Sequence, residues 1–123
     1  MEESVIVSFR DFDVYKKSYA CVLEIYAIAK RFPKEEMFAL ASQIKRASYS
    51  IPLNIAEGYG KSKGSNAEFK RFLYMSLGSA DEMQVLIDMC HDLGYITKEM
   101  HDELLSKYAE ISKMLQGLIK LRK

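Results

Sequence analysis

Residues 48–65, SYSIPLNIAEGYGKSKGS, decide how this chain folds. A proline inside a helix costs about 3 kcal/mol and an interior glycine about 1 kcal/mol, and this stretch contains both Pro52 and Gly58. Apolar residues nevertheless continue at helical spacing on both sides of the proline, at Ile44, Ala47, Ile51, Ile55 and Tyr59. The pattern therefore predicts one continuous helix that is kinked at Pro52.

Asn54 lies three residues after Ile51 and so points near the same apolar face, where an amide is costly unless it is hydrogen-bonded. Its partner is expected on a neighbouring helix or in the backbone that Pro52 frees. Gly58 and Gly60 would let another backbone approach closely and let the helix end. Two interpretations stay open at this point: a tightly packed, kinked helix with one satisfied asparagine, or a bend that shapes a surface for assembly or ligand binding.

Two stretches before residue 62 show the spacing of amphipathic helices. The first is expected to begin at Asp11 or Asp13 and to end before Pro33, because a residue before proline avoids helical geometry. Its expected core face is Tyr15, Val22, Ile25, Ala29 and Phe32. The second, which contains Pro52, is expected to begin at Pro33 or Lys34, with Met37 as its first core residue.

Two further helices are predicted after the segment GYGKSKG. Ser65 and Glu68 form an S-x-x-E capping box ahead of the third, and Gly94 is its expected left-handed cap. Thr97 is expected to cap the fourth helix. Short connections make consecutive helices antiparallel neighbours, so residues 1–123 are predicted to form a single all-α domain, an up-down-up-down four-helix bundle.

Composition limits the possible compartments and partners. The formal net charge is +1, so no overall basic excess indicates a nucleic-acid partner. Cys21 and Cys90 lie in separate apolar patterns and are expected to be buried free thiols. No uncharged apolar run of about 18 residues and no signal-peptide pattern is present, which predicts a cytoplasmic protein without membrane contact.

Several segments resemble one known family. They are QIKRA at 43–47, SIPLNIAEGYGK at 50–61, FKRFL at 69–73 and GSADE at 78–82, together with FRDFDVYKKSY and FPKEEMFAL nearer the start. The family is that of the four-helix-bundle proteins encoded by intervening sequences in 23S ribosomal RNA, which includes accessory variability determinants of diversity-generating retroelements. Lys45 and Lys61 depart from it where arginine is expected more often, which keeps the charge and loses bidentate phosphate geometry.

The resemblance implies a bundle that assembles into a ring of five subunits. It also implies a non-enzymatic role connected with structured RNA or nucleic-acid complexes. Neither the ring nor the RNA partner follows from composition or spacing.

Clustered basic residues give the candidate nucleic-acid-binding set, in which side chains contact phosphates without reading sequence. The set is Lys45, Arg46, Lys61, Lys63, Lys70 and Arg71. The last four fall at one end of the expected bundle, with Tyr59 and Phe69 or Tyr74 nearby for stacking. The competing interpretation is that these are solvated helix faces that keep the protein soluble.

The sequence offers little for an enzyme. Asp88 and His91 have the i, i+3 spacing of di-metal carboxylate bundles, but no second such pair exists, so we predict no metal, no cofactor and no small-molecule substrate. His91 is expected to interact with the negative end of its helix. Glu57 is expected to form a salt bridge with Arg46 or Lys61, or a contact between subunits. No nucleophile–base spacing is present.

Several tyrosines suggest a second apolar face. Tyr19 and Tyr26 are seven residues apart, and a bundle needs only one buried face per helix. A second face calls for a partner, which favours a homo-oligomer. The hypotheses left open are a nucleic-acid or ribonucleoprotein binder, a scaffold that recruits another protein, and a metalloenzyme. Pro52, Asn54, Glu57 and Gly58 are the residues expected to shape the subunit and its assembly.

Overall fold

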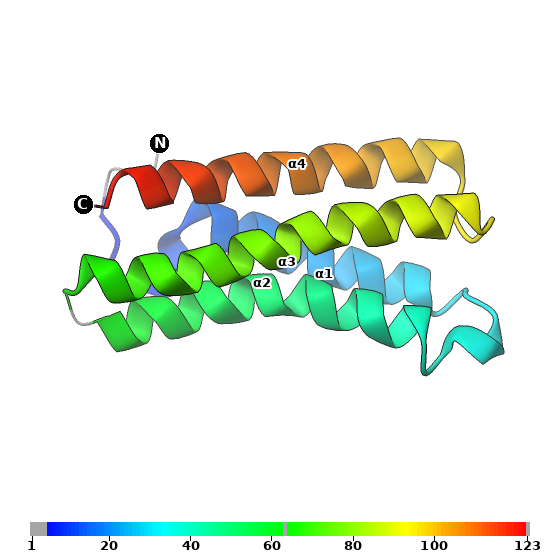
Figure 1. The fold of residues 1–123 in the computed structure, drawn as a ribbon, viewed down its shortest axis with the longest axis horizontal. Helices are drawn as coiled ribbons and strands as arrows, with labels where there is room; N and C mark the ends of the chain where they lie inside the picture. Colours follow the sequence, from blue (N-terminus) through cyan, green and yellow to red (C-terminus); the bar gives the residue numbers. More distant parts are fainter. Residues whose placement is uncertain (1–4, 63, 123) are drawn as a thin grey trace.

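The computed structural model describes residues 5–62 and 64–122, and all their regular structure is helical. Four long helices run α1 Asp13–Ala29, α2 Leu40–Ser62, α3 Asn66–Asp92 and α4 Lys98–Lys120. Two 3₁₀ turns, η1 Phe9–Asp11 and η2 Lys34–Glu36, precede α1 and α2. Consecutive helices are neighbours and α4 returns to α1 (Figure 1), which confirms the up-down four-helix bundle.

The core is apolar along its length, with one buried serine on each helix. Each of these four hydroxyls has a hydrogen-bond partner, because an unpaired hydroxyl in the core would cost stability. Ser18 and Ser48 bond the carbonyls three residues earlier in their own helices, at 3.1 and 2.7 Å. Ser76 and Ser112 bond across helices, to the Ile51 carbonyl at 2.8 Å and the Asp81 carboxylate at 3.2 Å.

The predicted core face of α1 is partly wrong. Val14, Ser18 and Cys21 are buried, whereas Tyr15 and Val22 are only half-buried. The face is displaced because the Tyr15 ring packs sideways against the rings of Phe9 and Tyr19. A core serine is also invisible to a search for apolar residues.

The predicted start of α2 is wrong as well. Residues after Pro33 form the 3₁₀ turn η2, Met37 is exposed, and α2 begins only at Leu40. The Glu36 carboxylate explains the late start, since it accepts the Leu40 amide at 3.2 Å and fixes a new helix N-terminus there. Its other oxygen accepts the Tyr95 hydroxyl at 2.7 Å, a contact from the α3–α4 connection.

α2 continues through Pro52, as predicted. The amide of Asn54 donates to the Ser50 carbonyl at 2.8 Å, within α2, and not to a neighbouring helix. Two hydroxyls of α3 reach this segment: Ser76 at the Ile51 carbonyl, and Ser79 at the Ser50 hydroxyl at 2.6 Å. The two residues that precede the proline are therefore both hydrogen-bonded to α3.

Gly58 is required by close packing. A Cβ built on it would lie 2.4 Å from the Phe72 Cβ, closer than two non-bonded carbon atoms can approach. It would also lie 3.3 Å from the Phe69 ring. A Cβ on Gly60 would meet nothing within 4 Å. The expectation of a close approach is confirmed at Gly58, where α2 meets α3, and is wrong at Gly60.

The N-caps predicted at Ser65 and Thr97 are confirmed, but the predicted capping box is only half formed, because the Glu68 carboxylate pairs with Arg71 and the Ser65 amide donates to the Ser62 carbonyl. Ser65 accepts the Glu68 amide at 3.2 Å and Thr97 accepts the Met100 amide at 3.1 Å. Gly94 has φ +84°, which only glycine adopts without strain. In the described part of the chain, no helix is both long and apolar enough to cross a lipid bilayer.

Candidate nucleic-acid interface

The end of the bundle that holds the α2–α3 turn gathers cations around two phenylalanines. It is also where both chain termini lie (Figure 1). Lys61, at the end of α2, places its Nζ 5.9 Å from the centre of the Phe72 ring. Arg71, on the first turns of α3, places its guanidinium 4.6 Å from the same ring. Two members of the predicted set thus meet at one side chain.

A third cation comes from the C-terminus. The Arg122 guanidinium lies 4.8 Å from the centre of the Phe69 ring, and its Nη1 donates to the Leu118 carbonyl at 3.1 Å. Arg122 is not in the set predicted from the sequence. Its position at the α2–α3 end follows from the antiparallel arrangement, which brings the end of α4 beside the start of α3. We call Lys61, Lys70, Arg71 and Arg122 the basic end.

Carboxylates moderate the charge of the basic end. Lys61 pairs with Glu57 at 2.9 Å, one of the two partners predicted for Glu57. Arg71 pairs with Glu68 at 2.9 Å, and this hydrogen bond lowers the pKa of Glu68. Both pairs join residues three or four apart in one helix and lie exposed, so they contribute little stability. A phosphate can displace such carboxylates without disturbing the bundle.

The rest of the predicted set divides in two. Lys70 lies beside Arg71, half-buried on α3, and Lys63 lies outside the described residues. Lys45 and Arg46 lie on the same helix as Lys61 but about 23 Å away along it at 1.5 Å per residue. Lys45 places its Nζ 5.2 Å from the Tyr26 ring of α1. These two residues therefore belong to a different surface.

The expected stacking residues are mostly inaccessible. Phe69 is buried against Phe12, and Tyr59 is half-buried, with its hydroxyl donating to the Ile6 carbonyl at 3.4 Å. Tyr74 is exposed. The two buried phenylalanines contact the cations of this end and are not free to stack on a base. Tyr74 is therefore the remaining stacking candidate.

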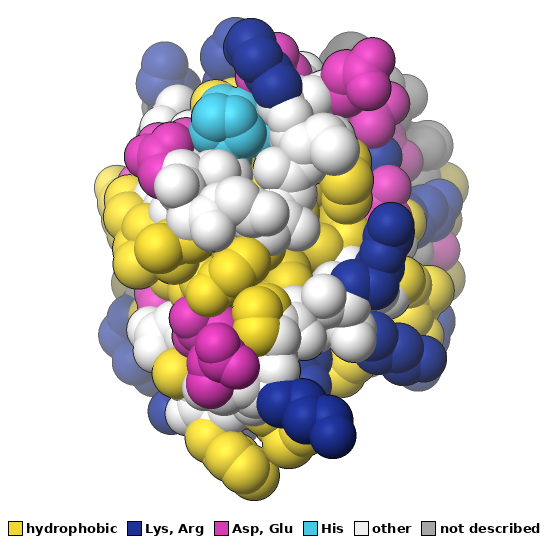
Figure 2. Space-filling model, turned by 90° about the vertical axis from the view of Figure 1, so that its right-hand side faces the viewer, with side chains coloured by type: hydrophobic (Ala, Val, Ile, Leu, Met, Phe, Trp, Pro, Cys, Tyr) yellow, Lys and Arg dark blue, Asp and Glu magenta, His cyan; other side chains and the backbone are white. Residues whose placement is uncertain are grey.

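The opposite end of the bundle is apolar at its centre. In Figure 2, hydrophobic side chains form a band across this end, with Lys and Arg side chains toward the rim. Phe38 is 91% exposed there and opens onto a groove between α2 and α3. The apolar walls of this groove are Phe38, Ala39, Leu40, Leu86, Met89 and Leu93.

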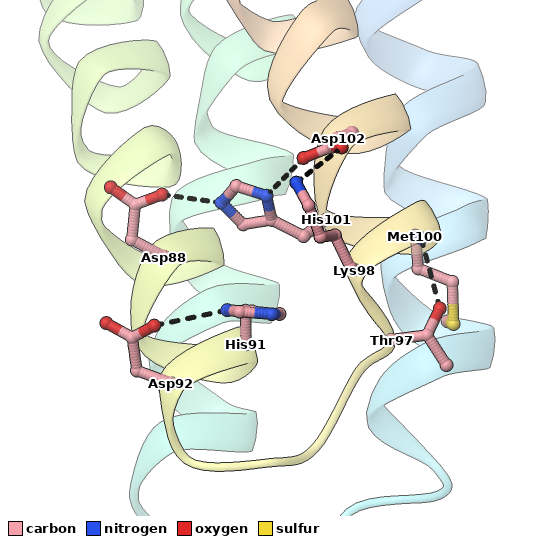
Figure 3. A network of polar contacts seen from close by, with 8 residues as sticks. All are labelled: Asp88, His91, Asp92, Thr97, Lys98, Met100, His101 and Asp102. Carbon is pink, nitrogen blue, oxygen red and sulfur yellow. Dashed lines mark hydrogen bonds and ion pairs between the residues drawn. The ribbon is translucent and has the colours of Figure 1, made fainter.

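The same end carries a polar cluster that sequence reasoning missed. His101 on α4 places Nε2 2.8 Å from an Asp88 oxygen and Nδ1 2.8 Å from an Asp102 oxygen (Figure 3). His91, in the last turn of α3, has Nδ1 3.1 Å from Asp92. A search for spacing within one helix does not find a pair that spans the α3–α4 turn. Among the described residues, no three His, Cys, Asp or Glu side chains are arranged to hold a metal ion.

Two exposed apolar strips run along the sides of the bundle. The α1–α2 strip is Tyr19, Leu23, Tyr26, Tyr49 and Leu53. The α3 strip is Val85, Met89 and Leu93. Within the described chain α1 and α3 are not neighbours, whereas α2 packs against both of them.

Both cysteines are buried and free, as predicted. Burial raises the pKa of the Cys90 thiol to about 11 and also raises that of Cys21. Neither thiol has the low pKa or the exposure of a nucleophile.

Comparison with known proteins agrees with the fold. A family model described as 23S rRNA-intervening sequence protein matches residues 10–117. A crystal structure from Bacteroides thetaiotaomicron, described as a protein with unknown function from the S23 ribosomal protein family, is 30% identical with a TM-score of 0.77. The match covers 87% of this chain and 95% of that chain. No curated protein matches the chain.

Proposed function

Because this chain belongs to the 23S rRNA-intervening sequence protein family, we propose that it is a non-enzymatic, homo-oligomeric bundle that binds RNA through its basic end. The observation that carries the proposal is the convergence of Lys61, Arg71 and Arg122 on Phe69 and Phe72. Three chain segments supply these cations. The carboxylate pairs of Lys61 and Arg71 are exposed and lie within single helices, so phosphate can compete for both cations.

Binding at the basic end is electrostatic and independent of sequence. Lysine and arginine contacts to phosphate position a nucleic acid without reading its bases. A single subunit offers few cations, so its affinity is low. An oligomer that repeats the basic end multiplies that attraction within one assembly.

A ring is the form of oligomer that the two apolar strips favour. Two different strips on one subunit fit a head-to-tail contact, in which one strip meets the other, and such contacts form a ring when the rotation between subunits closes. Charge at the borders gives limited support: Lys45 adjoins the α1–α2 strip at Tyr26 and Asp88 adjoins the α3 strip, but Arg46 lines the groove that contains Met89 and Leu93 of the α3 strip. Five subunits is the number that the family leads us to expect.

Light scattering on the protein as it elutes from a size-exclusion column measures the mass of the oligomer and so tests the ring. We expect a mass near five times the 14.2 kDa subunit. Leu23→Glu and Val85→Lys each spoil one strip, so each should give smaller species. A monomeric wild-type protein at micromolar concentration would contradict the ring.

RNA binding is tested with two matched pairs of variants. Lys70→Ala/Arg71→Ala removes adjacent cations at the basic end, and Lys30→Ala/Arg31→Ala removes an adjacent pair at the opposite end of the bundle. With a fluorescent RNA stem-loop at fixed ionic strength, we expect more than a tenfold loss of affinity for the first variant. The second should bind as the wild type does, and equal losses would contradict a localised site.

A second candidate function is recruitment of another protein. The groove beside Phe38 favours it, because a nearly fully exposed phenylalanine above apolar walls is unusual on a protein surface. Affinity capture from nuclease-treated lysate distinguishes the two functions. Partners that survive nuclease and disappear with Phe38→Ser indicate the scaffold, whereas partners that disappear with nuclease indicate RNA.

A further inference from the structure

His101 has a carboxylate oxygen 2.8 Å from each of its two ring nitrogens, Asp88 at Nε2 and Asp102 at Nδ1. An ionised carboxylate only accepts hydrogen bonds, and a neutral imidazole carries one N–H. Both contacts are hydrogen bonds only when both nitrogens are protonated. With both carboxylates ionised, this geometry fits an imidazolium at His101.

We propose that His101 is a pH-sensitive clasp that fastens the end of α3 to the start of α4 when it is protonated. Loss of one proton leaves a ring lone pair facing a carboxylate at hydrogen-bonding distance. Either tautomer produces this repulsion, on the Asp88 side or on the Asp102 side. The cluster must then rearrange, and the α3–α4 connection loosens.

The groups around His101 support its protonated form. The charged side chains of the cluster are Asp88 and Asp92 from α3 and Lys98 and Asp102 from α4 (Figure 3). Lys98 donates to the second oxygen of Asp102 at 3.0 Å, which fixes that carboxylate in place. Hydrogen bonds to Asp88 and Asp102 raise the pKa of His101 above its ordinary value.

His91 is the other titratable ring in the cluster, with its centre 5.0 Å from that of His101. It contacts Asp92, the residue next to it in sequence, so its bond does not join two helices. The contact between His101 and Asp88 does. A variant at His91 therefore serves as the matched control.

The segment that the clasp holds also reaches α2. Between the two helices, Ile96 is buried and Tyr95 donates to Glu36, whose other oxygen caps α2 at Leu40. The contact with Glu36 raises the pKa of Tyr95 to about 12, so this hydroxyl stays protonated where histidine titrates. His101 is thus the titrating member of a chain of contacts that joins α3, α4 and the start of α2.

The test combines histidine titration with hydrogen exchange on the full chain. NMR of the ring protons should give His101 a pKa above about 6.5, and that pKa should fall in Asp88→Asn. Protection factors of the amides at 93–98, corrected for intrinsic exchange rates, should fall as pH rises through that pKa. Amides in the middle of α2 provide the internal reference.

Two variants decide whether His101 is responsible. His101→Gln should abolish the pH dependence of protection at 93–98, and His91→Gln should keep it. If His101→Gln does not fold, Asp88→Asn takes its place and should reduce the dependence. A His101 pKa at or below about 6.5, or protection that is independent of pH in the wild type, would overturn the proposal.

Discussion

The two ends of the bundle use charged side chains in different ways. At the basic end, the pairs Lys61–Glu57 and Arg71–Glu68 each lie within one helix. At the opposite end, the pair Lys98–Asp102 also lies within one helix, but two further polar contacts join separate elements: His101 to Asp88, and Tyr95 to Glu36. Charges that join no elements can be given to a ligand, whereas charges that join helices belong to the fold. The comparison supports the proposed RNA binding at the first end and predicts a contribution to stability at the second.

A substitution at Gly58 should have the largest effect on the free energy of unfolding, because α2 and α3 pack most closely there, next to the basic end. Gly58→Ala places a Cβ 2.4 Å from that of Phe72, and overpacking of this kind costs about 1–3 kcal/mol of unfolding free energy. Urea denaturation measures the loss. Gly60→Ala is the control: its Cβ meets nothing, so better helix propensity should stabilise the protein by about 0.5–1 kcal/mol.

Ser76→Ala is expected to have the next largest effect. It removes the buried hydrogen bond to the Ile51 carbonyl, which should cost about 1 kcal/mol of unfolding free energy. The half-buried Ser79 makes its α2 contact at the surface, so Ser79→Ala should cost less in the same experiment. Equal losses would mean that burial of the Ser76 bond adds nothing.

Substitution of His101 should change the pH profile of stability. A raised pKa in the folded state stabilises the protein below the unfolded pKa near about 6.5, and this contribution disappears as pH rises through the folded pKa. His101→Gln should therefore be less stable than the wild type at about pH 5.5, with the difference shrinking toward about pH 9. A stability difference between His101→Gln and the wild type that grows with pH would contradict a stabilising role for protonated His101.

Removal of the basic-end charges should affect stability least. Lys70→Ala/Arg71→Ala breaks only one exposed pair within α3, and such pairs contribute little to folding. Its denaturation midpoint should match that of the wild type within error. A large loss of stability would show that these cations hold the fold together, and the contrast between the two ends would fail.

Local signals made most of the fold predictable from sequence. The caps at Ser65 and Thr97 and the turn at Gly94 depend on residues a few positions apart. The start of α2 was not predictable in this way. Its cap, Glu36, is held by Tyr95 from a connection that is distant in sequence.

The candidate site was predictable only in part. Sequence placed Lys61 and Arg71 at one end, because helix order determines which ends meet. It did not place Phe72 beneath them, nor Arg122 beside them, since these positions depend on how α2, α3 and α4 pack. The hydrogen bond between Asp88 and His101 was missed for the same reason.

The salt dependence of RNA affinity tests the central claim, that the basic end binds phosphate, most directly. For the wild type, the logarithm of affinity should fall steeply and linearly with the logarithm of salt concentration. The slope should become shallower by about one unit for each phosphate that Lys70→Ala/Arg71→Ala no longer neutralises, and should not change in Lys30→Ala/Arg31→Ala. A wild-type affinity that ignores ionic strength, or the same slope in all three proteins, would contradict the account.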